Sequence, residues 1–348
     1  MRKQSFISGS YMHIEDNKVD VPEVSVLVHT FNQSEYIEQC LDSVCSQNTT
    51  FKYEVIVHDD CSTDDTTEIL LAYKEQYPEK IRLVIQEQNK RSQGHRVISL
   101  SLPHAEGDYV AICEGDDYWI DEHKLQKQYD ALQRHPNVDL CFHPAKQYRN
   151  KKFHSIINEY YSEETVIPFE NVVEGRGGYM PTASLFIRKS SIYPFRDWFI
   201  ERAPVGDTFI QALGSSRGGA LFLSDSMSVY NRYSIGSATA GNLRKRSLEQ
   251  IANQAENYRD CYNQLSVGLS ESEKMSCRIA LSQLIFDLSV KALDDGYIDL
   301  FKSLFDRAWP DKHKKSAFVY IVWLARYIHF CRPIVRKKLA HKRNLVVT

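Results

Sequence analysis

Residues 109–119 read YVAICEGDDYW, an apolar run that leads directly into a short acidic turn. The run has the composition of a buried β-strand. The turn places three carboxylates, Glu114, Asp116 and Asp117, within four positions. Hard divalent cations prefer oxygen ligands, and one or two protein carboxylates often share such a cation with phosphate oxygens. The turn is therefore a candidate site for a metal and a diphosphate, and a solvated acidic turn is the alternative.

Upstream of this turn, short β-branched runs alternate with segments of helical periodicity. Strands are expected at residues 24–28, 53–58 and 81–85. A helix is expected after each of the first two strands, and the second helix should end before Pro78, because proline cannot donate a backbone hydrogen bond. This alternation predicts parallel strands joined by right-handed crossovers.

Polar segments follow three of these four strands, at residues 29–32, 59–62 and 114–117. In open parallel sheets, ligand sites lie outside the carboxyl ends of the strands. The three segments are far apart in the sequence, yet this topology brings them to one edge of the sheet. We therefore expect them to converge on a single crevice.

Residues 22 to about 235 resemble a family-2 glycosyltransferase with the GT-A fold. The resemblance rests on an ordered set of motifs: an opening strand and loop at residues 24–32, DDCSTDD at 59–65, EGDD at 114–117, GDT at 206–208 and SVYNRY at 228–233. It implies an α/β fold with a GT-A-type, Rossmann-like mixed sheet flanked by helices. It also implies transfer of a sugar with inversion of the anomeric configuration.

The resemblance implies a nucleotide site at His29, Thr30, Phe31 and Asp60, with Arg91 and Asp116 nearby. An aromatic ring can stack on uracil, and a carboxylate can accept the imide N–H of the base. For Phe31 the alternative is packing in the core, and for Asp60 it is capping of the following helix.

The resemblance also implies that Asp116 and Asp117 hold Mn²⁺ or Mg²⁺, which would stabilise charge on the departing diphosphate. Glu114 stands where the family usually has aspartate. Its longer side chain would reach the metal through water or hold the sugar instead. Arg232, like Lys90 and Arg91, is a candidate for contacts to the donor, and a solvated surface charge is the alternative.

Asp207 matches the family position of the general base, which would take the proton of the acceptor hydroxyl. The alternative is that Asp207 caps the helix expected after it. Trp119 offers a flat face for stacking on a donor or acceptor sugar, and packing in the core is an equal alternative.

Two departures from the family pattern concern the nucleotide site. Cys61 replaces the usual glycine of the DDGS motif, so a positive φ at this position would strain the turn. Asn231 and Tyr233 stand where arginine and histidine are common, which removes an expected phosphate or metal contact.

The chain divides into four expected segments. They are an N-terminal extension (1–21), a catalytic domain (22–240), a helical extension (241–311) and a basic amphipathic tail (312–348). Within the helical extension, Ser270 and Glu273 form a capping-box pattern that predicts the start of a helix.

The tail contains an aromatic and aliphatic run at residues 317–330, and every ionised side chain from Lys312 onward is lysine or arginine. The run is too short for a membrane span. It predicts an interfacial helix on an anionic membrane, or a buried terminal helix with a basic end.

No signal peptide is evident, and the eight cysteines occur singly, without zinc-type spacing. We therefore expect a cytoplasmic protein, either free or peripheral at the inner face of the cytoplasmic membrane. Nucleic-acid binding is not expected, because no motif accompanies the basic tail.

The sequence thus predicts an inverting, metal-dependent glycosyltransferase. Its expected donor is a UDP-sugar and its expected acceptor a glycan or lipid-linked saccharide of cell-surface polysaccharide synthesis. The transferred group would be a hexose or an N-acetylhexosamine. A sugar nucleotidyltransferase and a non-catalytic glycan-binding or scaffold protein are the alternatives, although residues 29–32 lack the glycines of a phosphate-gripping loop.

Overall fold

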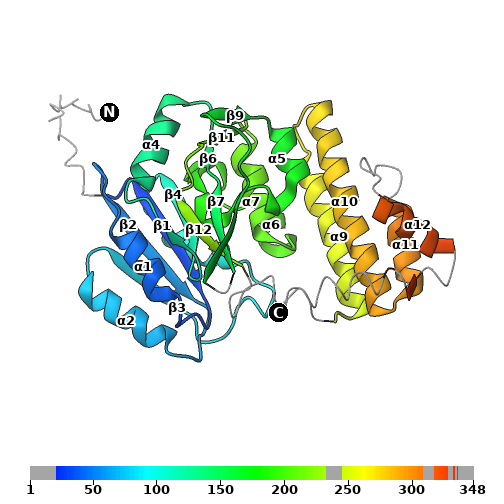
Figure 1. The fold of residues 1–348 in the computed structure, drawn as a ribbon, viewed down its shortest axis with the longest axis horizontal. Coiled ribbons are helices and arrows are strands. Elements are labelled where there is room, and N and C mark those ends of the chain that lie inside the picture. The colour runs from blue at the N-terminus through cyan, green and yellow to red at the C-terminus, as the bar shows by residue number, and fades with distance from the viewer. Residues whose placement is uncertain are drawn as a thin grey trace, which may run out of the picture.

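The computed structural model describes residues 21–149, 151–232, 245–308, 317–327, 332, 333 and 335. A mixed eight-stranded sheet with helices on both faces lies beside a group of C-terminal helices (Figure 1). This arrangement confirms the predicted α/β fold with a helical extension. Residues 1–20, Tyr233 and most of the expected basic tail lie outside the described residues.

The first four strands of the large sheet are parallel and confirm the predicted strands. They are β1 (Val24–Thr30), β2 (Tyr53–Asp59), β3 (Ile81–Ile85) and β4 (Tyr109–Glu114). All seven residues of β1 and of β2 are buried, because helices cover both faces of the sheet.

The other half of the large sheet is mixed. It consists of β10 (Phe186–Arg188), β6 (Leu140–Phe142), β11 (Ala220–Phe222) and β9 (Thr165–Ile167). Strand β10 is antiparallel to both β4 and β6, so β6 runs in the direction of β4, and β11 is parallel to β6. The carboxyl ends of β1, β2, β4, β6 and β11 therefore lie at one edge of the sheet, which we call the carboxyl edge.

A second sheet has four strands in the order β5-β12-β7-β8. They are β5 (Tyr118–Trp119), β12 (Ser228–Asn231), β7 (Ala145–Arg149) and β8 (Lys152–Ile157). Strand β5 begins immediately after the acidic turn and pairs with β12. The small sheet thus fixes the C-terminal end of the acidic turn.

Helices cover the two faces of the large sheet in two groups. On one face α1 (Ile37–Cys45), α2 (Thr66–Gln76) and α4 (Lys124–Arg134) share one hydrophobic core with the even-numbered residues of β1. On the other face lie α3 (Val97–Ser101), α5 (Phe169–Gly175), α6 (Asp197–Arg202) and α7 (Gly206–Ser215). Short 3₁₀ helices are η1 (Leu102–His104), η2 (Arg176–Gly178), η3 (Thr182–Ser184) and η4 (Lys189–Ser191).

The C-terminal helices are α9 (Leu248–Leu265), α10 (Glu271–Asp295), α11 (Ile298–Ala308) and α12 (Ala317–Tyr327). The predicted capping box of Ser270 and Glu273 is present at the start of α10. Helix α10 packs on α5, and α9 packs on α6 (Figure 1). One hydrophobic core runs from Leu27 in β1 through these helices to Val322 in α12.

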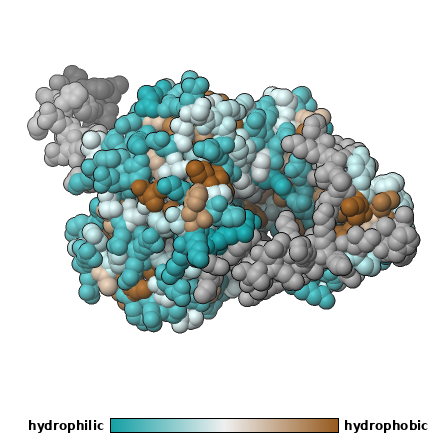
Figure 2. Space-filling view, in the orientation of Figure 1, coloured by the Kyte–Doolittle hydropathy of each residue, from teal (hydrophilic) through white to brown (hydrophobic). Residues whose placement is uncertain are grey.

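Helix α12 has one buried and one exposed face. Val322 and Ala325 are fully buried, whereas Tyr320, Trp323 and Tyr327 are exposed. Hydrophobic residues reach the surface on the side of the molecule where α11 and α12 lie (Figure 2). Among the described helices, none is both long and apolar enough to cross a membrane.

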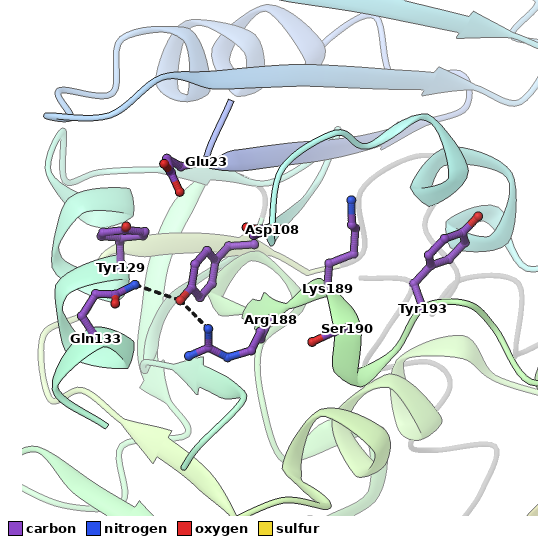
Figure 3. A pocket seen from close by; sticks show the side chains of 9 residues that line it. Glu23, Asp108, Tyr129, Gln133, Arg188, Lys189, Ser190 and Tyr193 are labelled. Atoms are coloured by element: carbon purple, nitrogen blue, oxygen red, sulfur yellow. Dashed lines mark hydrogen bonds between the residues drawn. The ribbon is translucent and has the colours of Figure 1, made fainter. Parts of the chain in front are cut away.

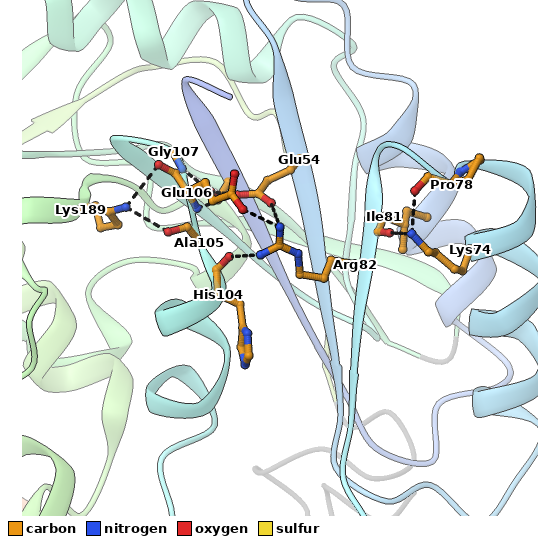
Figure 4. Close-up of polar contacts among 11 residues, drawn as sticks. Glu54, Lys74, Pro78, Ile81, Arg82, His104, Ala105, Glu106, Gly107 and Lys189 are labelled. Atoms are coloured by element: carbon orange, nitrogen blue, oxygen red, sulfur yellow. Dashed lines mark hydrogen bonds and ion pairs between the residues drawn. The ribbon is translucent and has the colours of Figure 1, made fainter. Parts of the chain in front are cut away.

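Polar contacts tie the strands together at the edge opposite the carboxyl edge (Figure 4). Arg82 donates to Glu106 at 2.6 Å and to the His104 carbonyl at 2.8 Å. Lys189 donates to the Ala105 carbonyl at 3.0 Å. Gly107 lies against the β1 backbone, where a Cβ atom would be 2.8 Å from the amide nitrogen of Ser25.

Candidate active site

The segments after β1, β2 and β4 meet at the carboxyl edge, because the three strands end in register. His29 lies opposite both His58 and Glu114, and Thr30 lies opposite Asp59. The convergence expected from the sequence is therefore present in the fold.

His29 links the nucleotide loop to the acidic turn. It is buried, its Nε2 lies 2.8 Å from Ser101 Oγ, and its Nδ1 lies 3.8 Å from Glu114 Oε1. The Glu114 side chain is 41% exposed. Its position among protein atoms raises the pKa of the carboxyl, but His29 and Arg91 outweigh this effect and hold the pKa below its usual value.

Asp60 fixes the basic loop that follows β3. Its two carboxylate oxygens accept the backbone N–H groups of Lys90 at 2.7 Å and Arg91 at 3.0 Å. It does not cap α2, whose N-cap residue is Asp65. Each oxygen of Asp60 keeps a second lone pair, so these bonds leave acceptor capacity for a base N–H.

Cys61 adopts the left-handed conformation, with φ of 66°. This is the backbone geometry that the family's glycine would adopt without strain. Its thiol lies 3.5 Å from the Glu87 carbonyl oxygen. The fold therefore keeps the turn of the DDGS motif despite the side chain.

The loop after β1 is clasped to the segment after β2. The Asn32 amide donates to Ser62 Oγ at 2.9 Å, and Asn32 Oδ1 accepts from the Thr63 amide at 2.7 Å. Phe31 is half-buried at the start of this loop. These contacts hold Phe31 at the carboxyl edge beside Asp60.

Glycine is required at position 115 because the acidic turn lies very close to Thr30 and Gln33 of the nucleotide loop. A Cβ atom there would lie 2.5 Å from Gln33 Oε1 and 2.9 Å from both Cβ and Oγ1 of Thr30. Those two oxygens are buried and have no hydrogen-bond partner in the structure. The glycine thus lets the acidic turn lie directly on the nucleotide loop.

Asn231, at the end of β12, holds the acidic turn from the other side. Its amide donates to Asp117 Oδ1 at 2.9 Å, and its side-chain Nδ2 donates to the Asp116 carbonyl at 2.6 Å. The sequence comparison noted only the arginine missing at this position.

Asp117 is 2% exposed and Asp116 is also buried. Burial raises the pKa of Asp117 well above its usual value, and the nearby Asp116, Cys113 and Glu114 raise it further. A cation would relieve this repulsion. The side chains of the turn offer oxygen donors only, a set that suits Mg²⁺ or Mn²⁺.

No group of three or more metal-binding side chains forms within the described ranges. The protein would therefore supply one or two carboxylates, and other ligands would come from a bound diphosphate or water. Mg²⁺ is usually held in this way. The residues present fit such a shared cation.

Asp207 lies in the first turn of α7 and is not its N-cap residue, which is Val205. Its Oδ1 accepts the Thr208 amide at 3.1 Å. Burial, and then the charge of Glu114, raise the pKa of Asp207 to about 6, while Arg91 acts in the opposite direction. The charges of Glu114 and Arg91 thus act on Asp207 in opposite directions.

Trp119 packs in the core, which the sequence left as an equal alternative to stacking on a sugar. It is 4% exposed, its Nε1 donates to the Ala183 carbonyl at 2.9 Å, and the ammonium group of Lys124 lies 4.0 Å from its ring centre. Both its indole N–H and one ring face are thus occupied by protein.

The two candidate arginines differ in placement. Arg91 is exposed on the loop held by Asp60. Arg232 is partly buried just after β12, and its amide donates to the Tyr148 carbonyl at 2.9 Å.

A cavity of about 530 Å³ lies away from this site, at the amino ends of β1 and β4 (Figure 3). Arg188 and Gln133 donate to the Tyr109 hydroxyl at its wall, at 2.6 and 2.8 Å. None of the residues assigned above to nucleotide, metal or base lines this cavity.

Comparisons with known proteins identify a family and several relatives of this chain. A family model described as "Glycosyl transferase family 2" matches residues 25–192. "Uncharacterized protein Rv1520" of Mycobacterium tuberculosis is 32% identical over 217 residues, which are 61% of this chain and 60% of that protein. The "Putative teichuronic acid biosynthesis glycosyltransferase TuaG" of Bacillus subtilis is 39% identical over 111 residues, 32% of this chain and 42% of TuaG.

Among solved structures, "S. aureus TarS 1-349 in complex with UDP-GlcNAc" matches with a TM-score of 0.65 and 17% identity. The match covers 92% of each chain, so the two proteins share a fold that includes the C-terminal helices. The chain spans about 60% of the length of its Mycobacterium relative.

Proposed function

We propose that this chain, whose residues 25–192 belong to glycosyl transferase family 2, is an inverting enzyme that uses a nucleotide-diphosphate sugar, with UDP-sugar as the expected donor. The observation that carries the proposal is the position of Glu114. Its Oε1 lies 3.8 Å from Nδ1 of His29 in the nucleotide loop, and its charge raises the pKa of Asp207. This supports a single site for the donor and the candidate base.

The nucleotide would lie on the loop after β1. Phe31 would stack on the base, and Asp60 would accept its imide N–H. The name of TarS's ligand, UDP-GlcNAc, supports a uridine nucleotide here. His29, Thr30 and Arg91 would line the same part of the crevice.

Asp116 and Asp117 would hold Mn²⁺ or Mg²⁺ beside the diphosphate. When bound, the cation would neutralise the charge that develops on the leaving group. Glu114 would face the donor sugar, and Arg232 would approach the donor from the end of β12.

Asp207 would accept the proton of the acceptor hydroxyl. A carboxyl with a pKa of about 6 is ionised at neutral pH and is a stronger base than an ordinary aspartate. Attack from the face opposite the leaving group would invert the anomeric carbon. The acceptor is proposed to be a glycan or lipid-linked saccharide of the cell surface, as the name of TuaG suggests.

Attachment to an anionic membrane at its cytoplasmic face is part of this proposal. The exposed aromatic face of α12 and the lysines and arginines around it are the chemistry of an interfacial helix. A lipid-linked acceptor would then be presented at the same surface.

The test is release of nucleoside diphosphate from a panel of nucleotide sugars, with Mn²⁺ or Mg²⁺ and with water, cellobiose or chitobiose as acceptor. Asp207→Asn should bind UDP normally and lose about 10²–10⁴-fold in turnover, the usual contribution of a general base. Asp197→Asn is the matched control, because Asp197 is an exposed aspartate in the first turn of α6. Equal turnover in the two variants would reject Asp207 as the base.

Asp116→Asn tests the metal assignment separately. It should abolish the stimulation of turnover by Mn²⁺ or Mg²⁺. Retention of full metal-stimulated rate in this variant would overturn the assignment.

A further inference from the structure

Three tyrosines gather at the carboxyl edge, beyond the donor side of the crevice. Tyr160 and Tyr161 follow β8, and Tyr179 follows η2. The rings of Tyr160 and Tyr179 stack with centres 4.5 Å apart and planes 15° apart. We call these residues the tyrosine platform.

The platform stands on the ends of two strands of the large sheet. The Tyr160 ring lies 6.3 Å from Phe142 and 6.0 Å from Phe222, the last residues of β6 and β11. Tyr161 meets Phe222 edge-on at 6.0 Å. Since β6 and β11 end at the same edge as β1 and β4, the platform and the acidic turn lie along one edge of the sheet.

Hydrogen bonds connect the platform to the segment that contacts Asp207. Asn158 Nδ2 donates to the carbonyls of Gly178 at 2.9 Å and Tyr179 at 3.0 Å, and the Tyr160 hydroxyl donates to the Tyr179 carbonyl at 2.8 Å. Gly177, the neighbouring residue, lies against Asp207, where a Cβ atom would be 3.3 Å from Oδ2. The platform is therefore fixed relative to the candidate base.

The outer surface of the platform is open to a ligand. Tyr160 is 37% exposed and Tyr161 is 43% exposed. A tyrosine ring combines an apolar face with a polar hydroxyl at its edge. A pyranose ring matches this combination, because it carries C–H groups on its faces and hydroxyls around its rim.

We propose that Tyr160 and Tyr161 bind a pyranose ring of the acceptor, and that Tyr179 supports them from beneath. This inference rests on the proposed function, because the acceptor hydroxyl must reach Asp207. The acceptor would therefore carry a sugar ring at this position, and an acyclic polyol phosphate would not bind here.

Saturation-transfer NMR on the full chain tests the platform without requiring turnover. The probes are cellobiose and chitobiose, with ribitol 5-phosphate as the ringless comparison, in the presence of UDP and the diamagnetic cation Mg²⁺. The ring C–H protons of at least one disaccharide should receive saturation from the wild-type protein. This signal should fall at least fivefold in Tyr161→Ala and persist in Tyr161→Phe, which keeps the ring.

Tyr160→Phe provides a second variant that keeps the stack and loses only the hydroxyl, with its bonds to the Tyr179 carbonyl and to Asn158 Nδ2. It should retain the disaccharide signal. The proposal is overturned if Tyr161→Ala keeps the full signal, if Tyr161→Phe loses it, or if ribitol 5-phosphate alone binds the wild-type protein.

UDP binding, measured calorimetrically on the same preparations, separates this inference from the proposed function. UDP affinity should be equal in the wild-type protein and in all three tyrosine variants. If the wild-type protein binds no UDP and releases none from the donor panel, the proposed function fails. If the wild-type protein binds UDP and releases it from a donor while Tyr161→Ala binds the disaccharides normally, only the platform fails.

Discussion

Replacing Gly115 by alanine should damage both stability and nucleotide binding. The added methyl group would lie 2.5 Å from Gln33 Oε1 and 2.9 Å from Cβ of Thr30. The end of the Gln33 side chain can move, but Thr30 is the last residue of β1 and is held by the sheet. Overpacking of this kind costs about 1–3 kcal/mol.

Denaturant unfolding followed by circular dichroism measures this cost. In a thermal melt, an unfolding entropy of about 2.1 cal/mol/K per residue over a cooperative unit of 348 residues gives about 1.4 °C per kcal/mol, so a decrease of about 1–4 °C is expected. UDP affinity should fall about tenfold, which corresponds to about 1.4 kcal/mol, because Thr30 belongs to the nucleotide loop.

Gly178→Ala is the matched control. A Cβ atom at Gly178 would meet no other atom within 4 Å. Its effect on the free energy of unfolding should stay within about 0.5 kcal/mol, as for most surface substitutions. If Gly115→Ala unfolds at the same denaturant concentration as Gly178→Ala, the close approach of the acidic turn to the nucleotide loop is wrong.

Three further predictions concern pH, the strained turn and the membrane. The base must be ionised, so kcat/KM should decline as the pH falls through about 6, the raised pKa of Asp207, and a profile flat down to pH 5 would exclude this base. Cys61→Gly should raise the free energy of unfolding by about 0.5–1 kcal/mol. The left-handed conformation costs cysteine more than glycine loses in backbone entropy on folding. A lower free energy of unfolding in a urea titration would contradict this. Replacing Trp323 and Tyr327 by serine should weaken cosedimentation with vesicles of equal phosphatidylglycerol and phosphatidylcholine, whereas unchanged binding would count against α12 as the contact.

The sequence predicted the strands and acidic loops of the first half well. Residues 24–28 and 53–58 are apolar runs with polar segments directly after them, and parallel topology leaves few ways to arrange such strands. The sequence left open whether Cys61 takes a positive φ, and the structure shows that it does, with φ of 66°.

Other features depend on contacts between segments that are distant in sequence. Trp119 was equally compatible with a core or a sugar site, and its burial is set by Ala183 and the Lys124 ammonium group. Asn231 donates to Asp116 and Asp117 because β12 pairs with β5, which holds the end of β12 beside the acidic turn. Strand β5 has only two residues, so composition could not predict it. The tyrosine platform likewise requires β6 and β11 to end side by side.

The hydrophobic core that joins the sheet to the C-terminal helices makes these two regions mutually dependent for folding. Phe209 of α7 lies 5.4 Å from the ring of Tyr262 in α9, and α10 covers α5. A fragment ending near residue 240 would expose the apolar faces of α5, α6 and α7 to water. We expect such a fragment to aggregate, and we expect the intact chain to lose both regions in a single cooperative transition on heating.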